Sequence, residues 1–351
     1  MTKRIVIMAG GTGGHVFPAL AVAQYLRAQG WQVSWMGTRK GMESRIIPEN
    51  SIEIDYMAVQ GLRGKGMLAL LQMPLMLLRA CWQAKSILQA RQPNVVLGMG
   101  GFVAGPGGLL AKLMGIPLVI HEQNQIPGTT NRLLSGLANK VLEAFPNSFV
   151  ESKQAVLTGN PLRMAFTAQS NEPTTTRHAE LHVLVMGGSL GAQRLNEVLP
   201  EALALLGGSV EVRHQTGDKM LEQVRLAYAD KAIQANVVPF IEDVVGAYHW
   251  ADIVICRAGA MTVSEVAAMG VPAIFIPYPY AIDDHQTANA QYLVAAGAGM
   301  MIAQQQLTAA LLCEHIKACM ARLAAMAQAA RQCAKLNATQ RVAEQCMLEG
   351  A

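Results

Sequence analysis

Two glycine-rich loops have the composition of phosphate-binding sites. GGTGGH occupies residues 10–15 directly after an apolar run, and GGSLGA occupies residues 187–192 after a second apolar run, about half the chain later. Each pattern is typical of a buried strand that turns tightly into a helix N-terminus, where backbone N–H groups and the helix dipole attract anions. Glycine also lets a phosphate or sugar approach the backbone closely. The repeat predicts two nucleotide-type domains that face one cleft, one for a donor and one for an acceptor.

The first loop departs from a dinucleotide-binding fingerprint. The segment 31–36, about 20 positions on, lacks the acidic residue that would hold a ribose, so an NAD or FAD domain is a weak interpretation. A third glycine loop, GMGGFVAGP at 98–106, supplies a second backbone cradle for an anionic group in the same half. Tight packing of small residues between helix and sheet is the alternative explanation for both loops.

Acid–base chemistry in the first half is available at two places. His15 ends the first loop, where an imidazole can take up a proton near neutral pH. The sequence HEQN at 121–124 follows an apolar run, at the strand end where open α/β sheets bind ligands. The alternatives are a structural hydrogen bond for His15 and a solvated loop for residues 121–124.

The second half carries RAGAMTVSE at 257–265 after another apolar run. Small residues and Thr262 suit a helix start whose amides face phosphate, and Glu265, one turn inside, is placed to accept two ribose hydroxyls; an ordinary helix carboxylate is the alternative. Asp283 and Asp284 precede a further helix and equally suit an N-cap. No D-x-D motif occurs, so the sequence does not support a metal that bridges a nucleotide diphosphate.

Strand-like runs alternate with helical patterns along the chain, which predicts an α/β architecture of parallel sheets built from βαβ units. In the first half, the expected strands are 4–9, 32–37, 52–58, 94–98, 117–121 and 140–143, and the expected helices are 17–29, 41–46, 67–91, 105–114 and 128–137. In the second half, the expected strands are 181–186, 210–215, 236–240, 253–256, 273–276 and 299–302, and the expected helices are 191–206, 218–228, 242–250, 261–269, 285–296 and 308–334.

The best linker is the segment 160–163, Asn-Pro-Leu-Arg, followed by a polar stretch from Gln169 to Arg177 that has no apolar periodicity. It predicts domains at 1–160 and 161–334. The last segment, 335–351, is weakly periodic, and its return to the first domain stays open.

Composition limits the classes of protein. A chain of 351 residues fits two domains, and with 52% hydrophobic and 15% charged residues it is not expected to be disordered. A net charge of +4 is too small to indicate nucleic-acid binding. Lys3 and Arg4 lead straight into a short strand, so no signal peptide is expected, and no run of about 18 apolar residues predicts a transmembrane helix. The six cysteines lack CxxC or zinc spacing, which indicates reduced thiols in a cytosolic protein.

The ordered set of motifs resembles one family. GGTGGHVFPALAVA, GMGGFVAGP, HEQN, TGNPLR, GGSLGA and RAGAMTVSEVAAMGVPAIFIPYP occur in order over about residues 3–300. Together they resemble the bacterial UDP-N-acetylglucosamine transferases that convert lipid I to lipid II in peptidoglycan synthesis. The resemblance implies the GT-B fold, with two Rossmann-like domains and a cleft between them, and inversion at the anomeric carbon with no required metal or other cofactor. Met261 and His285 depart from the residues expected at their positions.

The resemblance also implies roles for individual residues. Ser189 and its glycine neighbours would contact the donor diphosphate, and Arg163 would pair with phosphate charge. The backbone of Ile241 and the Ala260–Glu265 segment would hold uridine, with Glu265 on the ribose. The sugar hydroxyls would be bound by Asn124 and Gln286. The remaining residues of the uridine segment are Met261, Thr262, Val263 and Ser264.

On the acceptor side, the implied roles belong to the first half. Thr12, Gly13 and Gly14 would line the sugar and acceptor. His15 is the preferred base for the muramyl C4 hydroxyl, with Glu122 as an assistant or competitor. Helix-end amides aimed at the departing UDP would lower the barrier.

An acceptor with a polyprenyl tail requires contact with a membrane. The stretch 67–82 is apolar and is flanked by Arg63, Lys65, Arg79 and Lys85. It is too short and too interrupted to span a bilayer, but it suits a helix in the interface, with its cations toward anionic headgroups on the cytoplasmic face of the inner membrane. Packing in the core is the alternative. Other proteins of cell-wall synthesis are possible partners that no residue identifies.

Two other function classes compete with the transferase. A UDP-N-acetylglucosamine 2-epimerase shares the two-domain cleft but needs neither the apolar stretch nor the glycine loop at 98–106. A non-catalytic membrane scaffold would have no reason to keep His15, Glu265 and Gln286.

Overall fold

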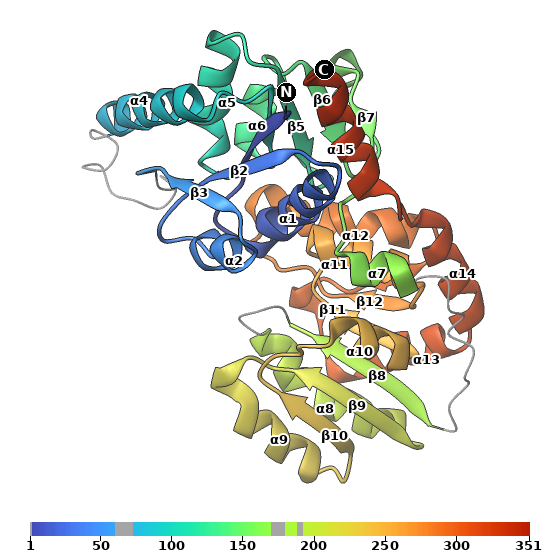
Figure 1. Cartoon of the computed structure of the whole chain (residues 1–351). Coiled ribbons are helices and arrows are strands. Elements are labelled where there is room, and N and C mark those ends of the chain that lie inside the picture. The colour runs from blue at the N-terminus through green and yellow to red at the C-terminus, as the bar shows by residue number, and fades with distance from the viewer. Residues whose placement is uncertain (1, 60–72, 170–179, 188–191) are drawn as a thin grey trace. The chain divides into compact units, whose positions relative to one another are not determined.

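The computed structural model describes residues 2–59, 73–169, 180–187 and 192–351. The chain divides into two compact units, Met1–Arg163 with Leu336–Ala351, and Met164–Lys335. Each unit is a parallel sheet covered by helices (Figure 1). The expected α/β architecture with two Rossmann-like sheets is confirmed.

The first unit contains a sheet in the order β3-β2-β1-β4-β5-β6-β7, with every pair parallel. Its strands are β1 (Arg4–Met8), β2 (Gln32–Gly37), β3 (Glu53–Tyr56), β4 (Val95–Gly98), β5 (Leu118–Glu122), β6 (Lys140–Glu143) and β7 (Val156–Leu157). Its helices are α1 (Gly13–Ala28), α2 (Glu43–Glu49), α4 (Met73–Arg91), α5 (Ala104–Leu113), α6 (Thr129–Leu134) and α15 (Ala338–Glu349), with the 3-10 turn η1 (Glu151–Lys153).

The strands of this sheet are buried on both faces. In β1, Ile5 and Ile7 pack in the cluster that includes α1 and α15, whereas Val6 and Met8 pack in the cluster that includes α4, α5 and α6. Successive side chains of a strand point to opposite faces, so a continuous apolar run is what a sheet with helices on both sides requires. Figure 1 shows α15 beside α1, with α4, α5 and α6 grouped together.

The C-terminal helix α15 belongs to the first unit. Its buried residues Val342, Ala343 and Cys346 join the cluster around α1. Lys3 Nζ donates to the carbonyl oxygens of Gly350 at 2.8 Å and Ala351 at 2.7 Å, which ties the two ends of the chain together.

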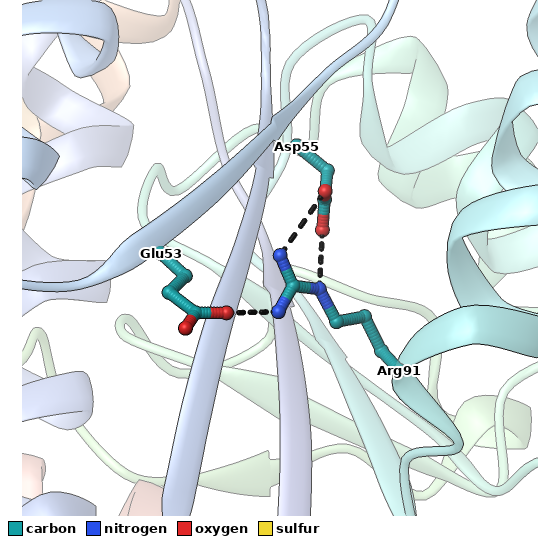
Figure 2. Close-up of polar contacts among 3 residues, drawn as sticks. All are labelled: Glu53, Asp55 and Arg91. Carbon is teal, nitrogen blue, oxygen red and sulfur yellow. Dashed lines mark hydrogen bonds and ion pairs between the residues drawn. The ribbon is translucent and has the colours of Figure 1, made fainter.

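An ion-pair cluster joins the end of α4 to β3 (Figure 2). Arg91, the last residue of α4, donates from Nε to Asp55 Oδ2 at 2.7 Å and also pairs with Glu53. Glu53 and Asp55 are two apart in the strand and therefore share a face. The hydrogen bond with Asp55 is the main cause of a raised Arg91 pKa. The cluster fixes one end of the helix that carries the apolar stretch considered above.

The second unit contains a sheet in the order β10-β9-β8-β11-β12-β13, again with every pair parallel. Its strands are β8 (Leu181–Met186), β9 (Val210–Gln215), β10 (Gln234–Val238), β11 (Ile253–Cys256), β12 (Ala273–Phe275) and β13 (Gly299–Met301). Its helices are α7 (Met164–Gln169), α8 (Gln193–Leu206), α9 (Leu221–Ala229), α10 (Val244–Trp250), α11 (Ala260–Met269), α12 (His285–Ala295), α13 (Ala309–Met320) and α14 (Leu323–Cys333), with 3-10 turns η2 (Asp218–Met220), η3 (Ile282–Asp284) and η4 (Gln304–Gln306).

Some elements differ from the sequence-based expectation. The single helix expected at 308–334 is two helices, α13 and α14. Leu312 and Ile316 of α13 pack in the sheet core with Met326 of α14, and α14 also packs against α11. The chain turns between the two helices without a glycine or proline. The short elements β7 and α7 were not expected, and α1 begins at Gly13 rather than at residue 17.

Candidate functional site

In both units, the candidate loops follow the two strands where the strand order reverses. In the first unit these are β1 and β4, paired as Met8 with Gly98; in the second they are β8 and β11, paired as Met186 with Cys256. Open α/β sheets bind ligands at this switch point, beyond the carboxyl ends of the strands. The topology therefore places the glycine loops of each unit where a ligand is expected.

The first glycine loop, at 10–15, is in close contact with the third, at 98–106. Gly101 has φ +80°, and a Cβ atom there would lie 2.6 Å from the carbonyl oxygen of Gly10. Gly11 has φ +96°. A side chain at Gly101 is excluded both by backbone conformation and by space. The glycines thus let two loops from neighbouring strands approach, which also agrees with the packing alternative.

Helix α1 begins in the first loop. Thr12 is its exposed N-cap residue, and its carbonyl oxygen accepts from the N–H groups of His15 and Val16. Gly13 and Gly14 form the first turn, whose N–H groups are the ones that helix geometry leaves without an intrahelical acceptor. These three residues have the backbone arrangement of an anion site.

Glu43 holds the first loop, a role that sequence analysis missed. Its carboxylate is buried and accepts from the N–H of Gly11 at 3.1 Å, and from the N–H and hydroxyl of Thr38 at 2.9 and 2.7 Å. Glu43 lies at the start of α2, where a negative charge is favourable. Nothing local in the sequence distinguishes it from an ordinary helix carboxylate.

His15 is paired with Gln123, another residue to which sequence analysis gave no role of its own. Nδ1 of His15 lies 2.8 Å from Oε1 of Gln123, and the ring lies against Gly100, where a Cβ would be 3.0 Å from Cε1 of His15. Gln123 also contacts the buried His121. His15 is half-buried.

Glu122, the expected assistant or competitor of His15, is enclosed by hydrogen-bond donors. Its side chain is 1% exposed and accepts four hydrogen bonds, from the N–H of Asn124, the side chain of Asn124, the N–H of Gly128 and the side chain of Asn131. Two donors contact each carboxylate oxygen of this buried side chain, and a role for Glu122 in proton transfer stays a prediction. The same contacts orient Asn124.

Arg163 is exposed at the end of the first unit, with its guanidinium 5.8 Å from the ring centroid of Phe17 in α1. The Asn-Pro-Leu segment before it is buried. This contact places the guanidinium beside α1, the helix that carries His15. Arg163 belongs to the first unit, whereas the expected donor loop at 187–192 belongs to the second.

In the second unit, Ser189 lies outside the described residues, as do its glycine neighbours Gly188 and Gly191. The adjoining part of the site is described: the N–H of Arg257 donates to the carbonyl oxygen of Met186, which brings the start of the 257–259 loop to the end of β8. Ile241 donates its N–H to Oε1 of Gln215 at 3.1 Å. A nucleobase bound at Ile241 would therefore meet a backbone N–H that already has a hydrogen-bond partner.

Helix α11 starts at Ala260 after Gly259, an N-cap in extended conformation. Met261 and Thr262 lie half-buried in its first turn, and the Ser264 hydroxyl donates to the carbonyl oxygen of Ala260. Val263 differs from its neighbours in the expected uridine segment. Its side chain is fully buried in the core, and its N–H donates to the carbonyl oxygen of Gly259.

Glu265 lies half-buried one turn into α11. The hydroxyl of the buried Tyr248 is 3.5 Å from its Oε2. A partly exposed carboxylate near the start of a helix fits the acceptor expected for ribose hydroxyls.

Arg257 organises the loop beside Gln286. Its guanidinium donates to the carbonyl oxygens of Ile276 and Pro277 at 2.9 and 3.3 Å, and to Gln304 Oε1 at 2.6 Å. Burial lowers the pKa of Arg257. In the same loop, the N–H of Tyr278 donates to Gln286 Oε1 at 2.9 Å, which turns the donor end of that amide away from the backbone.

Asp283 and Asp284 both have left-handed backbone conformations, with φ +53° and +50°. Asp284 is the N-cap residue of α12, but its side chain makes no cap hydrogen bond to the backbone; Oδ1 instead accepts from the hydroxyl of Thr287 at 2.8 Å. Among the described residues, no group of three or more His, Cys, Asp and Glu side chains could hold a metal ion.

Family comparison decides the class of protein. Residues 5–143 match the glycosyltransferase family 28 N-terminal domain, and residues 182–346 match the glycosyltransferase family 28 C-terminal domain. The chain belongs to glycosyltransferase family 28. The two matches correspond to the two sheets.

Relatives of this family 28 chain are similar over their whole length. It is 56% identical to a UDP-N-acetylglucosamine--N-acetylmuramyl-(pentapeptide) pyrophosphoryl-undecaprenol N-acetylglucosamine transferase of Methylococcus capsulatus, over 99% of both chains. It is 50% identical to the protein of the same name from Shewanella oneidensis, over 98% and 97% of the chains. The crystal structure of Acinetobacter baumannii MurG has a TM-score of 0.85 and 43% identity, with 99% of both chains covered.

More distant structures share only the fold with this chain. A UDP-GlcNAc 2-epimerase from Neisseria meningitidis bound to UDP-GlcNAc has a TM-score of 0.67 at 14% identity, over 99% of this chain and 100% of its own. An identity this low carries no information on the reaction.

Proposed function

We propose that this chain transfers N-acetylglucosamine from UDP-N-acetylglucosamine to the C4 hydroxyl of the muramyl sugar of undecaprenyl-pyrophosphoryl-MurNAc-pentapeptide, lipid I, and so forms lipid II. The observation that carries the proposal is the 56% identity, over 99% of both chains, with the transferase named for this reaction. The epimerase alternative has only a fold-level likeness at 14% identity. The site residues below are inferences from geometry.

The proposed donor groups lie in the second unit. The N-terminus of α11 offers the dipole and first-turn amides of Met261 and Thr262 to the nucleotide, and Glu265 accepts from the ribose hydroxyls. Gln286, whose Oε1 is held by the Tyr278 N–H, presents its amide donors to a sugar hydroxyl oxygen. Oriented amides that stabilise the charge on departing UDP need no reorganisation during the reaction.

The proposed acceptor groups lie in the first unit. The acceptor C4 oxygen attacks the anomeric carbon from the face opposite to UDP, the bond between that carbon and the diphosphate oxygen breaks, and the configuration inverts. The hydroxyl proton passes to His15, whose ring is held from behind by Gln123 and Gly100. Thr12, Gly13 and Gly14 offer backbone groups to the acceptor or sugar beside it.

A product assay tests the reaction. The protein is incubated with UDP-N-acetylglucosamine, with and without a short-chain lipid I analogue, and UDP and sugar products are quantified. UDP release that depends on the acceptor supports transfer. Formation of the 2-epimer without acceptor would replace the proposal by the epimerase alternative.

We also propose that the first unit binds the cytoplasmic face of the inner membrane. Helix α4 has one buried face, with Ala80, Ala84 and Leu88, and one exposed face, with Leu75, Leu78 and Trp82 at 76, 68 and 72% exposure. The helix therefore serves the core on one side, as the packing alternative required, and leaves an apolar side uncovered. Residues 67–72 of the expected interfacial stretch, and the flanking Arg63 and Lys65, lie outside the described residues.

The neighbouring helices also carry exposed apolar side chains. Leu113 of α5 and Leu133 of α6 are each 72% exposed, and α5 packs against both α4 and α6 on the same face of the sheet (Figure 1). We call Leu75, Leu78, Trp82, Leu113 and Leu133 the apolar surface. Arg79 and Lys85 are exposed on α4 beside it. Apolar side chains rimmed by cations suit an anionic bilayer. No helix of the described residues is long and apolar enough to cross a membrane.

A further inference from the structure

Behind His15, the side chains of Gln123 and His121 form a hydrogen-bonded series that ends on a backbone carbonyl. Oε1 of Gln123 lies 2.8 Å from Nδ1 of His15, and Nε2 of Gln123 lies 3.1 Å from Nδ1 of His121. Nε2 of His121 lies 3.0 Å from the carbonyl oxygen of Gly159. The acid–base role proposed for His15 does not by itself account for Gln123 or His121.

We propose that His121 and Gln123 fix the tautomer of His15, so that Nδ1 carries the hydrogen and the lone pair of Nε2 is left to take the proton of the acceptor hydroxyl. Gln123 and His121 are thus positioning residues, because they act through His15. The catalytic consequence rests on the proposed function, whereas the tautomer itself is a property of the free protein.

The direction of the series is set at its buried end. The carbonyl oxygen of Gly159 can only accept, so Nε2 of His121 must carry a hydrogen. His121 is fully buried, and burial lowers its pKa to about 4. The ring is therefore neutral near pH 7, and with its hydrogen on Nε2, its Nδ1 must be an acceptor.

This acceptor determines how the Gln123 amide is turned. Only the NH₂ group of Gln123 can donate to Nδ1 of His121, and its other hydrogen points to the carbonyl oxygen of His121 at 3.2 Å. The amide oxygen of Gln123 then faces His15. Because that oxygen can only accept, Nδ1 of His15 must donate, and in the neutral ring Nε2 is the nitrogen without a hydrogen.

The backbone around this series is held in place. The carbonyl oxygen of His121 also accepts from Asn131 Nδ2 at 3.0 Å, and the carbonyl oxygen of Gln123 accepts from Asn160 Nδ2 at 3.0 Å. Gln123 is 1% exposed, so water does not compete for its amide. An amide in these surroundings would have to break two hydrogen bonds to His121 in order to turn over.

The proton balance of the step is simple. The C4 hydroxyl gives its proton to Nε2 of His15 as its oxygen bonds to the anomeric carbon. The resulting imidazolium keeps its Nδ1–H bond to Gln123, and no proton moves to Gln123 or His121. The neutral amide orients the ring in both charge states, as the aspartate of a Ser-His-Asp triad does with a charge.

The tautomer is measured directly by two-bond ¹H–¹⁵N correlation spectra of ¹⁵N-histidine-labelled protein, without substrate. His15 is assigned by its absence in His15→Ala. We expect the Nδ1–H pattern for His15 and the Nε2–H pattern for His121 in the wild type. An Nε2–H pattern for His15 would overturn the proposal.

Two variants of Gln123 separate orientation from packing. Gln123→Met keeps a similar volume but accepts nothing, and should abolish the Nδ1–H preference and lower kcat by about 10²-fold, with donor affinity unchanged. Gln123→Glu keeps an acceptor for His15 and should retain the Nδ1–H tautomer. Gln125→Met, the same change in a side chain that donates instead to Pro146, is the matched control and should leave spectrum and kcat unchanged.

The outcomes distinguish the two proposals. A His15 tautomer that persists in Gln123→Met overturns the positioning role, and the wild-type and Gln123→Glu spectra decide the point if the methionine variant does not fold. If the wild-type tautomer is as stated but His15→Ala keeps its kcat, the catalytic role of His15 fails while the assignment of the tautomer stands.

Discussion

The N–H of Gly11 donates a 3.1 Å hydrogen bond to the buried carboxylate of Glu43, so the first glycine loop is tied to the start of α2. The same carboxylate binds Thr38 at the end of β2, the strand beside β1. The first glycine loop, which is expected to bind a ligand, is therefore held in place by the buried carboxylate of Glu43.

Removal of this carboxylate should loosen the loop. We expect Glu43→Ala to lower the free energy of unfolding by about 2–3 kcal/mol, because charge-assisted hydrogen bonds to Gly11 and Thr38 are lost, and to lower kcat. Chemical denaturation and steady-state kinetics measure the two effects. Glu49→Ala, in an exposed position of the same helix, is the control and should change neither. Equal behaviour of the two variants would contradict the role of Glu43.

The contact between Gly100 and His15 gives a second test. Gly100→Ala should lower kcat at least tenfold, because its Cβ would stand 3.0 Å from Cε1 of His15 and push the ring aside. The substitution also costs about 1–3 kcal/mol, because the backbone has φ +92°. Steady-state kinetics with donor titration measure the loss of kcat, and chemical denaturation measures the loss of stability.

Gly115→Ala controls for backbone strain alone. Gly115 has φ +72°, and a Cβ there meets nothing within 4 Å. This variant should lose stability and keep its kcat. If both variants lose kcat in proportion to their stability, the contact with His15 has no special importance.

The sequence predicted most of the fold because buried parallel strands read as apolar runs. Both sheets and their switch-point loops follow from such runs, for example Ile5–Met8 and Val183–Met186. The separation of α13 from α14 was missed, since it depends on which surface each helix covers and leaves no glycine or proline signal. The two-residue strand β7 is too short to produce a pattern.

The candidate site was only partly predictable. The loops and His15 have local signals, but the contact of Glu43 with Gly11 spans 32 residues and depends on strand pairing. Glu122 and Gln123 are adjacent in one motif, and only the coordinates separate a carboxylate enclosed by four donors from an amide that faces His15. Val263 lies in the expected donor segment, but its side chain points into the core.

Donor binding should depend on Glu265. We expect Glu265→Ala to weaken UDP-N-acetylglucosamine binding by about 1.5–3 kcal/mol, roughly 10- to 150-fold, because ribose hydroxyls lose a charged acceptor. Glu265→Gln should be milder. Calorimetry with UDP and 2′-deoxy-UDP is the sharper measurement: the wild type should prefer UDP, and the alanine variant should lose most of that preference.

The control for this prediction is Glu314→Ala, an exposed glutamate of α13 in the same unit. It should bind both nucleotides as the wild type does. An alanine variant of Glu265 with unchanged affinity would remove that residue from the donor site.

Acid should destabilise the second unit through His214. Its ring is fully buried between the Tyr228 hydroxyl and Asn196 Oδ1, and burial lowers its pKa to about 3 from 6.5. The unfolded chain therefore binds a proton that the folded unit excludes, so stability is complete above about pH 6.5 and falls as the pH drops toward 3. At pH 5 the loss from this group is about 2 kcal/mol.

Comparison of variants isolates this contribution from other titrating groups. The difference in unfolding free energy between wild type and His214→Gln should shift by about 2 kcal/mol in favour of the variant between pH 7.5 and pH 5. Tyr228→Phe, which keeps the buried imidazole, should retain the pH dependence of the wild type. Parallel curves for wild type and His214→Gln would show that His214 does not exclude a proton.

Membrane binding should depend on α4 through both charge and apolar area. Replacing Arg79 and Lys85 with Glu should weaken binding to anionic vesicles at least tenfold, since each exposed cation near such a surface contributes about 1 kcal/mol. High salt should reproduce that loss. Trp82→Ser should weaken binding independently of salt, because the 72% exposed indole provides apolar contact.

Charge reversal of Lys219 and Lys317, exposed in the second unit, is the matched control and should leave vesicle binding unchanged. Co-sedimentation with vesicles and turnover of a soluble short-chain acceptor are measured on each variant. All of them should keep the soluble activity, because the substituted side chains point away from the core that supports His15. If the Arg79 and Lys85 double variant sediments like the wild type, the cations of α4 do not face the bilayer. If Trp82→Ser collapses the soluble activity as well, the apolar face of α4 serves the fold rather than the membrane.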